Sequence, residues 1–253
     1  MADDTIIEVR DLTVGYDNLT VLENIDFTVR RGEVFCILGG SGCGKSTLLK
    51  HMIGLYPPFA GDVLLFGESI VRADEAARQR LMRRFGVTYQ GGALFGSMTL
   101  MENVELPLAE YTDLSRAERR KVAAAKLAQV DLAGFEDYMP AEISGGMRKR
   151  AGLARALALD PEMLFFDEPS AGLDPITAAE LDRLILKLRD QSGATIVVVT
   201  HDLDSVFTIA DRIIMLSKQE KRIVAEGDPR RLQTESEVAW VRDFLTRDGL
   251  SRR

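Results

Sequence analysis

The sequence of 253 residues lacks the features that mark membrane-spanning, secreted and nucleic-acid-tracking proteins. No apolar run approaches the roughly 18 residues that a membrane-spanning helix needs, and the start, MADDTIIEVR, has neither the basic region nor the apolar core of a secretion signal. The only two cysteines, Cys36 and Cys43, have a spacing that suits neither a zinc site nor a disulfide framework. The formal net charge of -7 argues against binding along nucleic-acid phosphates. We therefore expect a protein of the reducing cytosol, which would need a partner for any role in a membrane.

What is present predicts a globular α/β fold. The chain is 46% hydrophobic and 28% charged, and short β-rich runs alternate with longer helical patterns, which indicates a largely parallel sheet with helices on its faces. Continuous apolar runs, typical of strands buried on both faces, occur at 34–38, 163–166 and 195–200. Three other strand-like runs look more exposed and predict an antiparallel sheet, at 6–9, 63–66 and 223–226.

Helix boundary signals divide the rest of the chain. Ser115 and Glu118 form a capping box at the start of one helix. Asp174 and Pro175 cap and begin another helix, which Gly193 ends. Helical patterns replace strands between about residues 91 and 160, which predicts a helical insertion in the α/β core.

A phosphate-binding loop follows the strand at 34–38. The sequence GGSGCGKST places G-x-x-x-x-G-K-S between a strand and a helix, which is the context that this motif requires. Glycines let the backbone amides surround phosphate at a helix N-terminus, Lys45 adds charge at the β- and γ-phosphates, and the Ser46 hydroxyl can ligate Mg²⁺. The predicted loop residues are Gly39, Gly40, Ser41, Gly42, Cys43, Gly44, Lys45, Ser46 and Thr47.

A pair of carboxylates ends the strand at 163–166. Because side chains alternate along a strand, Asp167 and Glu168 point in different directions. One carboxylate can therefore bind the Mg²⁺ shell while the other faces the attacking water, and we assign Asp167 to the metal and Glu168 to the general base. Together with the phosphate loop, this pair predicts a P-loop NTPase.

The segment AEISGGMRKRAGLARAL narrows this prediction. The order of phosphate loop, SGG and DEPSAGLD resembles the ATP-binding cassette (ABC) ATPases over nearly the whole chain, from residue 6 to residue 232. The resemblance implies ATP and Mg²⁺ as cofactors and a P-loop NTPase fold of the ABC type. In that fold a RecA-like parallel-sheet core carries an antiparallel β subdomain and a helical subdomain, here at about 91–160. The ATPase domain would then span 1–232, and 233–253 would form a helical tail.

The same resemblance implies further nucleotide contacts in this subunit. Tyr16 matches the aromatic residue that stacks on adenine, although a surface tyrosine at a strand edge is the simpler alternative. Gln90 matches the glutamine that joins the metal site to the helical subdomain. His201 matches the switch histidine near the γ-phosphate. Gln90 and His201 are therefore candidate catalytic residues beside Glu168.

Other implied contacts belong to a dimer. Ser144, Gly145 and Gly146 match the signature that contacts the γ-phosphate held by the opposite subunit, and Asp174 matches the loop that crosses the dimer as well as capping a helix. One phosphate loop and one signature in the chain imply a head-to-tail homodimer. The usual signature has leucine and glutamine where this sequence has Ile143 and Met147. Because methionine cannot donate a hydrogen bond, one cross-dimer contact should be missing.

The runs GGALFGSMTLMENVELPL and ISGGMRKRAGLARALALDPEMLFFDEPSAGLDPITA resemble the ATPase of Mla/Mce-type phospholipid transporters, which maintain outer-membrane lipid asymmetry. This resemblance implies transmembrane permease subunits, an MCE-type substrate-binding protein, a small STAS-type regulator and a place on the cytoplasmic face of the bacterial inner membrane. The alternatives are the ATPase of a small-solute transporter, an ABC ATPase acting on DNA or ribosomes, and a small-molecule P-loop kinase.

Three segments stay ambiguous at this level. The apolar side chains after Gln90 suit either a docking groove for a partner helix or the core of the helical insertion, namely Phe95, Met98, Leu100 and Met101. The basic run 148–150 suits a solvated face, or a contact to anionic lipid or to a neighbouring subunit. The apolar stripe of the last helix, which includes Trp240, suits packing on the other ATPase, on the regulator or on its own domain.

Overall fold

The computed structural model describes residues 4–246. They form two compact units: the first contains the chain up to Arg78 together with the part from Thr195 onward, and the second contains Gln79–Ala194. Within the described residues, no helix is both long enough and apolar enough to cross a bilayer.

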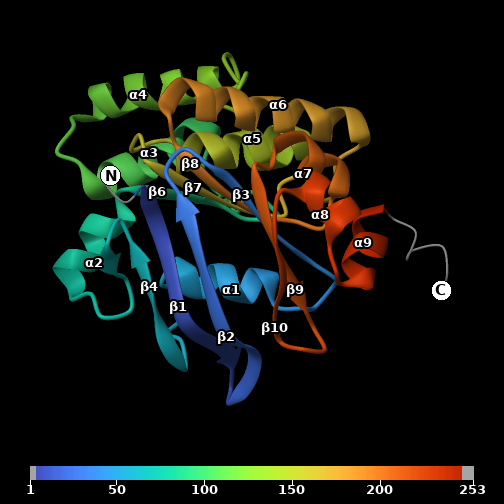
Figure 1. Cartoon of the computed structure of the whole chain (residues 1–253). Coiled ribbons are helices and arrows are strands. Elements are labelled where there is room, and N and C mark those ends of the chain that lie inside the picture. Colours follow the sequence, from blue (N-terminus) through green and yellow to red (C-terminus); the bar gives the residue numbers. More distant parts are fainter. Residues whose placement is uncertain (1–3, 247–253) are drawn as a thin grey trace. The chain divides into compact units, whose positions relative to one another are not determined.

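The first unit contains an antiparallel sheet with the strand order β2-β1-β4-β5 (Figure 1). Asp17 and Asn18, both with positive φ, connect the two long strands as a tight hairpin turn. Ile6, Ile7 and Val63 are at most 1% exposed, so the runs 6–9 and 63–66 are more buried than expected. The third run, 223–226, is half-buried to exposed, as expected. β1 is buried because it lies between β2 and β4 in the sheet. The strands are β1 (Thr5–Tyr16), β2 (Leu19–Arg30), β4 (Ala60–Leu65) and β5 (Glu68–Ser69).

The same unit contains a second run of paired strands, in the order β10-β9-β3-β8. β3 is buried at every residue and pairs in parallel with β8 and β9, as its continuous apolar run predicts. The expectation for 223–226 was wrong, because β10 pairs with β9 and not with the antiparallel sheet; the tight turn between β9 and β10 makes them partners. The bounds are β3 (Val34–Gly39), β8 (Thr195–Val199), β9 (Arg212–Ser217) and β10 (Arg222–Gly227).

Short helices complete the first unit. α1 is the next element after β3. α9 buries Val241 and Leu245, while Trp240 stays 36% exposed in an edge contact with Phe244. The expected tail at 233–253 contains α9, and residues 247–253 lie outside the described part. The helices are α1 (Lys45–Met52), α7 (Leu203–Ile209), α8 (Pro229–Glu235) and α9 (Ala239–Thr246), and α2 (Glu75–Met82) joins this unit to the next.

The second unit combines two parallel strands with four α-helices. β6 pairs with β7 in register, and α3, α4 and α5 pack on one another. The predicted capping box of Ser115 and Glu118 is confirmed at α4, and Asp174 and Gly193 cap the two ends of α6 as predicted. The bounds are β6 (Phe85–Thr88), α3 (Leu100–Tyr111), α4 (Arg116–Gln129), a 3-10 turn (Pro140–Glu142), α5 (Gly145–Ala156), β7 (Met163–Asp167) and α6 (Pro175–Ser192).

Candidate functional site

The phosphate loop lies between β3 and α1. Gly39 has a φ of 151°, and a Cβ there would lie 2.5 Å from Cys43 Sγ, so only glycine fits. Lys45 is 7% exposed, and its Nζ donates to the Gly39 carbonyl at 2.9 Å and to the Gly40 carbonyl at 3.3 Å. An ideal Cβ at Gly40 would meet open space. The loop therefore has a held cation beside an open backbone, which suits an anionic ligand.

His201 lies at the same edge of the first unit as this loop. β3 and β8 run in parallel with Ile37 opposite Val199, and the Thr200 amide continues the ladder by donating to the Ile37 carbonyl at 3.2 Å. His201 follows directly and is exposed. The carboxyl ends of parallel strands thus bring the phosphate loop and His201 together, as expected of a ligand-binding edge.

Tyr16 belongs to an aromatic cluster. Its ring centroid lies 6.3 Å from that of His51 and 5.8 Å from that of Tyr56. His51 is buried on α1, its Nδ1–H donates to the Thr47 carbonyl at 2.8 Å, and its Nε2 is buried with no hydrogen-bond partner among residues 4–246. Sequence reasoning missed His51 and Tyr56. The available signal was that His51 lies one helical turn after Thr47, so both residues are on the same face of α1.

In the second unit, β6 and β7 bring three predicted residues to one edge. Thr88 lies opposite Phe166. Gln90 follows β6 by two residues, and Glu168 follows β7 by one. Asp167 is the last residue of β7 and is 8% exposed, Glu168 is half-buried with a left-handed φ of 51°, and Gln90 is exposed. Because Glu168 lies outside β7 and has a left-handed φ, the alternation of side chains along a strand does not extend to it. The expected different directions of Asp167 and Glu168 stay a prediction.

The predicted signature caps α5. The Ser144 hydroxyl accepts a hydrogen bond from the Met147 amide at 3.2 Å. A Cβ at Gly146 would lie 2.8 Å from Thr177 Cγ2, so α5 and the start of α6 are in close contact. The two carboxylate oxygens of Asp174 accept from the amide and the hydroxyl of Thr177, and these hydrogen bonds lower the pKa of Asp174.

The side chains of the basic run 148–150 contact other residues of the second unit. Arg148 donates to the Ile143 carbonyl at 2.8 Å, and Arg150 forms ion pairs with Asp131 and Glu180, both at 2.9 Å. All three side chains of the run are half-buried. Because the three side chains are half-buried and Arg148 and Arg150 have partners inside this unit, the run is not a fully solvated face. A contact to anionic lipid or to a neighbouring subunit stays a prediction.

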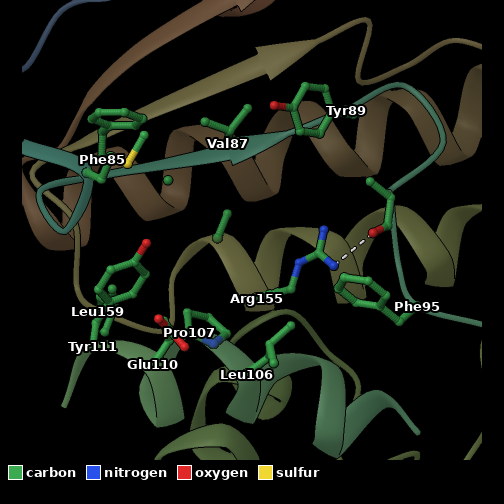
Figure 2. Close-up of a pocket in the computed structure, with 14 residues that line it drawn as sticks. Phe85, Val87, Tyr89, Phe95, Leu106, Pro107, Glu110, Tyr111, Arg155 and Leu159 are labelled. Atoms are coloured by element: carbon green, nitrogen blue, oxygen red, sulfur yellow. Dashed lines mark hydrogen bonds between the residues drawn. The ribbon is translucent and has the colours of Figure 1, made fainter. Parts of the chain in front are cut away.

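A cavity of about 580 Å³ lies against α3, α5 and β6 in the same unit. Phe95 lines it and is 50% exposed, whereas Leu100 and Met101 are core residues, exposed by 0% and 4%. The core alternative therefore holds for Leu100 and Met101. Phe95 lines an open cavity and Met98 is half-buried, and docking of a partner helix there stays a prediction. Figure 2 shows Arg155 beside Phe95; its guanidinium donates to the Ala93 carbonyl at 2.8 Å.

A family model for ABC transporters matches residues 22–171. The chain belongs to the ABC transporter ATP-binding family. It is 40% identical over 246 residues to the intermembrane phospholipid transport system ATP-binding protein MlaF of Escherichia coli K12, covering 97% of this chain and 90% of MlaF. It is 44% identical over 239 residues to the probable ribonucleotide transport ATP-binding protein mkl of Mycobacterium tuberculosis H37Rv, which covers 94% of this chain but only 66% of mkl, less than two thirds of its length.

A solved structure carries the same fold. The ATP-binding cassette MJ0796, a dimer in a post-hydrolysis state bound to ADP and Pi, superimposes with a TM-score of 0.79 at 31% identity and covers 88% of this chain and 98% of that one. The chain is thus an ABC ATPase that binds and hydrolyses ATP. The expected P-loop NTPase fold of the ABC type is confirmed.

The burial of His51 gives this ABC ATPase a testable pH dependence. Desolvation lowers the pKa of His51 in the folded state. As pH falls below about 6.5, the unfolded chain therefore binds the proton first, so the contribution of His51 to the free energy of unfolding is complete above that pH and is lost toward the folded-state pKa. Urea unfolding at several pH values should show that the free energy of unfolding falls less for His51→Met than for the wild type as the pH is lowered below about 6.5. Equal losses in the two proteins would contradict the lowered pKa of His51.

Proposed function

We propose that this ABC ATPase drives a membrane phospholipid transporter of the Mla/Mce type, which maintains outer-membrane lipid asymmetry. The observation that carries the proposal is the 40% identity to MlaF across 97% of this chain and 90% of MlaF. The identity extends over nearly the full length of both proteins, beyond the ATP-binding motifs that ABC ATPases share.

The proposed chemistry follows from groups that each unit places at a strand edge. The phosphate loop binds the triphosphate with Lys45, Tyr16 stacks on adenine, and His201 senses the γ-phosphate. Glu168 accepts a proton from the attacking water, a role typically worth about 10²–10⁴ in rate. The other proposed nucleotide contacts are Gly39, Gly40, Ser41, Gly42, Cys43, Gly44, Ser46 and Thr47.

The oxygens of Ser46, Gln90 and Asp167 would suit Mg²⁺, a hard cation that is usually held by one or two carboxylates together with waters and substrate phosphates. When bound, the ion neutralises charge on the phosphates. Asp167 suits it because the carboxylate is almost buried at the end of β7.

We further propose that ATP closes a head-to-tail homodimer and that hydrolysis reopens it. Ser144, Gly145 and Gly146 would contact the γ-phosphate bound by the partner subunit, and Asp174 would lie in the loop that crosses the interface. The dimeric state of MJ0796 supports this arrangement. Because ATP bridges only the closed state, its binding shifts the population toward closure.

Two substitutions separate binding from hydrolysis. Lys45→Ala should abolish ATP binding or turnover, because the phosphates lose their main cation.

Glu168→Gln should bind ATP, hydrolyse it about 10²–10⁴-fold more slowly and accumulate as a closed dimer. Nucleotide-binding titrations, phosphate release and size-exclusion chromatography measure these effects. Wild-type turnover in either variant would overturn that residue's assignment.

The cavity against α3, α5 and β6 is the proposed docking groove for a cytoplasmic helix of the permease. Its wall is mostly aromatic and aliphatic, and Phe95 at its rim is half exposed. Its two charged lining groups differ: Arg155 donates to the Ala93 and Gly92 carbonyls, whereas Glu110 is exposed and has no described hydrogen-bond partner. The permease helix should therefore be apolar with a basic side chain opposite Glu110.

Charge reversal tests this groove. Glu110→Lys should lower the amount of permease that co-purifies with the ATPase, by about tenfold or more if one charge-assisted contact becomes a repulsion. Its ATP hydrolysis as an isolated protein should stay unchanged. Glu23→Lys is the matched control, since Glu23 is an exposed side chain on β2. Equal permease recovery from both variants would argue against docking in the groove.

The remaining proposed partners follow from the likeness to MlaF. An MCE-type substrate-binding protein and a small STAS-type regulator would complete the complex, and the ATPase would lie on the cytoplasmic face of the bacterial inner membrane through its permease. The last helix, α9, offers the regulator or the second ATPase an exposed Trp240.

Purification of the chain from detergent-solubilised native membranes tests the transport assignment. Mass spectrometry of the co-purifying material should identify a multi-pass permease, an MCE-type protein, a STAS-type protein and bound phospholipid. Recovery of no membrane protein would contradict the proposal.

A second candidate is the ATPase of a small-solute transporter. The 44% identity to mkl, whose name gives ribonucleotide transport, favours it. Recovery of a solute permease without phospholipid in the same purification would support this candidate over the first.

A further inference from the structure

Lys149, on the signature helix α5, contacts the backbone that carries Glu168. Its Nζ donates to the Pro169 carbonyl at 2.6 Å and to the Glu168 carbonyl at 3.2 Å. The side chain is half-buried, and desolvation lowers the pKa of Lys149 while the nearby Glu168 opposes that change. The ammonium therefore binds two adjacent carbonyls of a single turn, directly after β7.

That turn has a conformation that needs support. Glu168 has a φ of 51°, in the left-handed region, which is unfavourable for a residue with a side chain. Its carbonyl also accepts a hydrogen bond from the Ala171 amide at 3.2 Å. The left-handed residue turns the chain out of β7, and so it sets the direction in which the Glu168 carboxylate points.

Packing alone does not require a charge at this position. The small space beside Lys149 is lined by apolar side chains, including Leu153, Phe166 and Leu181. A methionine has nearly the length of the lysine stem and would fill this space without desolvating an ammonium. The feature that a methionine would lack is the pair of hydrogen bonds to the carbonyls of Glu168 and Pro169, which the charge of the ammonium strengthens.

We propose that Lys149 is a positioning residue for Glu168. By holding the two carbonyls, it fixes the left-handed turn and thereby aims the carboxylate at the attacking water. This inference rests on the proposed role of Glu168 as general base. Because Lys149 lies in the second turn of the helix that Ser144 caps, it also joins the signature directly to the turn that bears the base.

α5 also holds the loop after Gln90 through a cationic side chain that donates to two backbone carbonyls, as Lys149 does at the turn after β7. Arg155 donates to the Ala93 carbonyl at 2.8 Å and to the Gly92 carbonyl at 3.2 Å. A Cβ at Gly152 would lie 2.8 Å from the Gly92 carbonyl oxygen, so the loop rests on the helix backbone. A displacement of α5 would thus move the turn at Glu168 and the loop after Gln90 together.

Steady-state hydrolysis by the purified full-length protein tests the inference. Lys149→Met should lower kcat by about 10–100-fold, because a misplacement of about 1 Å can cost 10²-fold, while KM for ATP changes less than about twofold. Lys149→Gln should recover part of the rate, because its amide group can donate to both carbonyls. Lys121→Met, at an exposed position of α4, is the matched control and should keep the wild-type rate.

Four outcomes are decisive. A wild-type kcat in Lys149→Met would overturn the inference. It would also be overturned if Lys149→Met lowered the thermal midpoint and Lys149→Gln lost as much activity as Lys149→Met, since both results indicate a purely structural role. In the Glu168→Gln background, Lys149→Met should cause little further loss, because both act on the same step. Wild-type turnover by Glu168→Gln would instead remove the base assignment itself, which distinguishes failure of the proposed function from failure of the role of Lys149.

Discussion

The structure of the phosphate site depends on one steric constraint, the close approach of the chain at the end of β3. All six residues of this strand are buried, and its last residue, Gly39, leaves no room for a Cβ between Cys43 and Leu216. The strand must therefore turn into the loop at that point, and Lys45 begins α1 six residues later with its Nζ directed back at the Gly39 carbonyl. A buried strand thus places a cation and open backbone at one edge, which is the requirement for binding phosphate.

Much of this could be read from the sequence because the signals are local. The strand at 34–38, the capping box at Ser115 and the cap at Asp174 each depend on neighbouring residues, and the structure confirms all three. Pairing depends on distant residues. The run 223–226 was therefore assigned to the wrong sheet, although its hairpin with β9 is short.

Side-chain partners were the least predictable part of the site. A basic run gives no sign of what each member meets, and only the fold shows that Arg150 finds carboxylates while Lys149 finds carbonyls. The apolar run after Gln90 is similar, since Leu100 is core and Phe95 lies at the rim of a cavity. His51 had no motif at all, and its burial beside Tyr16 follows from the packing of α1 on β1.

The choice of partner matters for the electrostatics of an ATPase. A carboxylate that pairs with a cation cancels its charge, whereas a carbonyl fixes the position of the cation and leaves the charge in place. Lys149 and Arg155 each donate to backbone carbonyls of the loops that follow Glu168 and Gln90. Arg150 and Arg212, which contact neither loop, form ion pairs with carboxylates. A chain with a net charge of -7 thereby retains positive charge beside two loops proposed to take part in ATP hydrolysis, where the substrate brings the compensating negative charge.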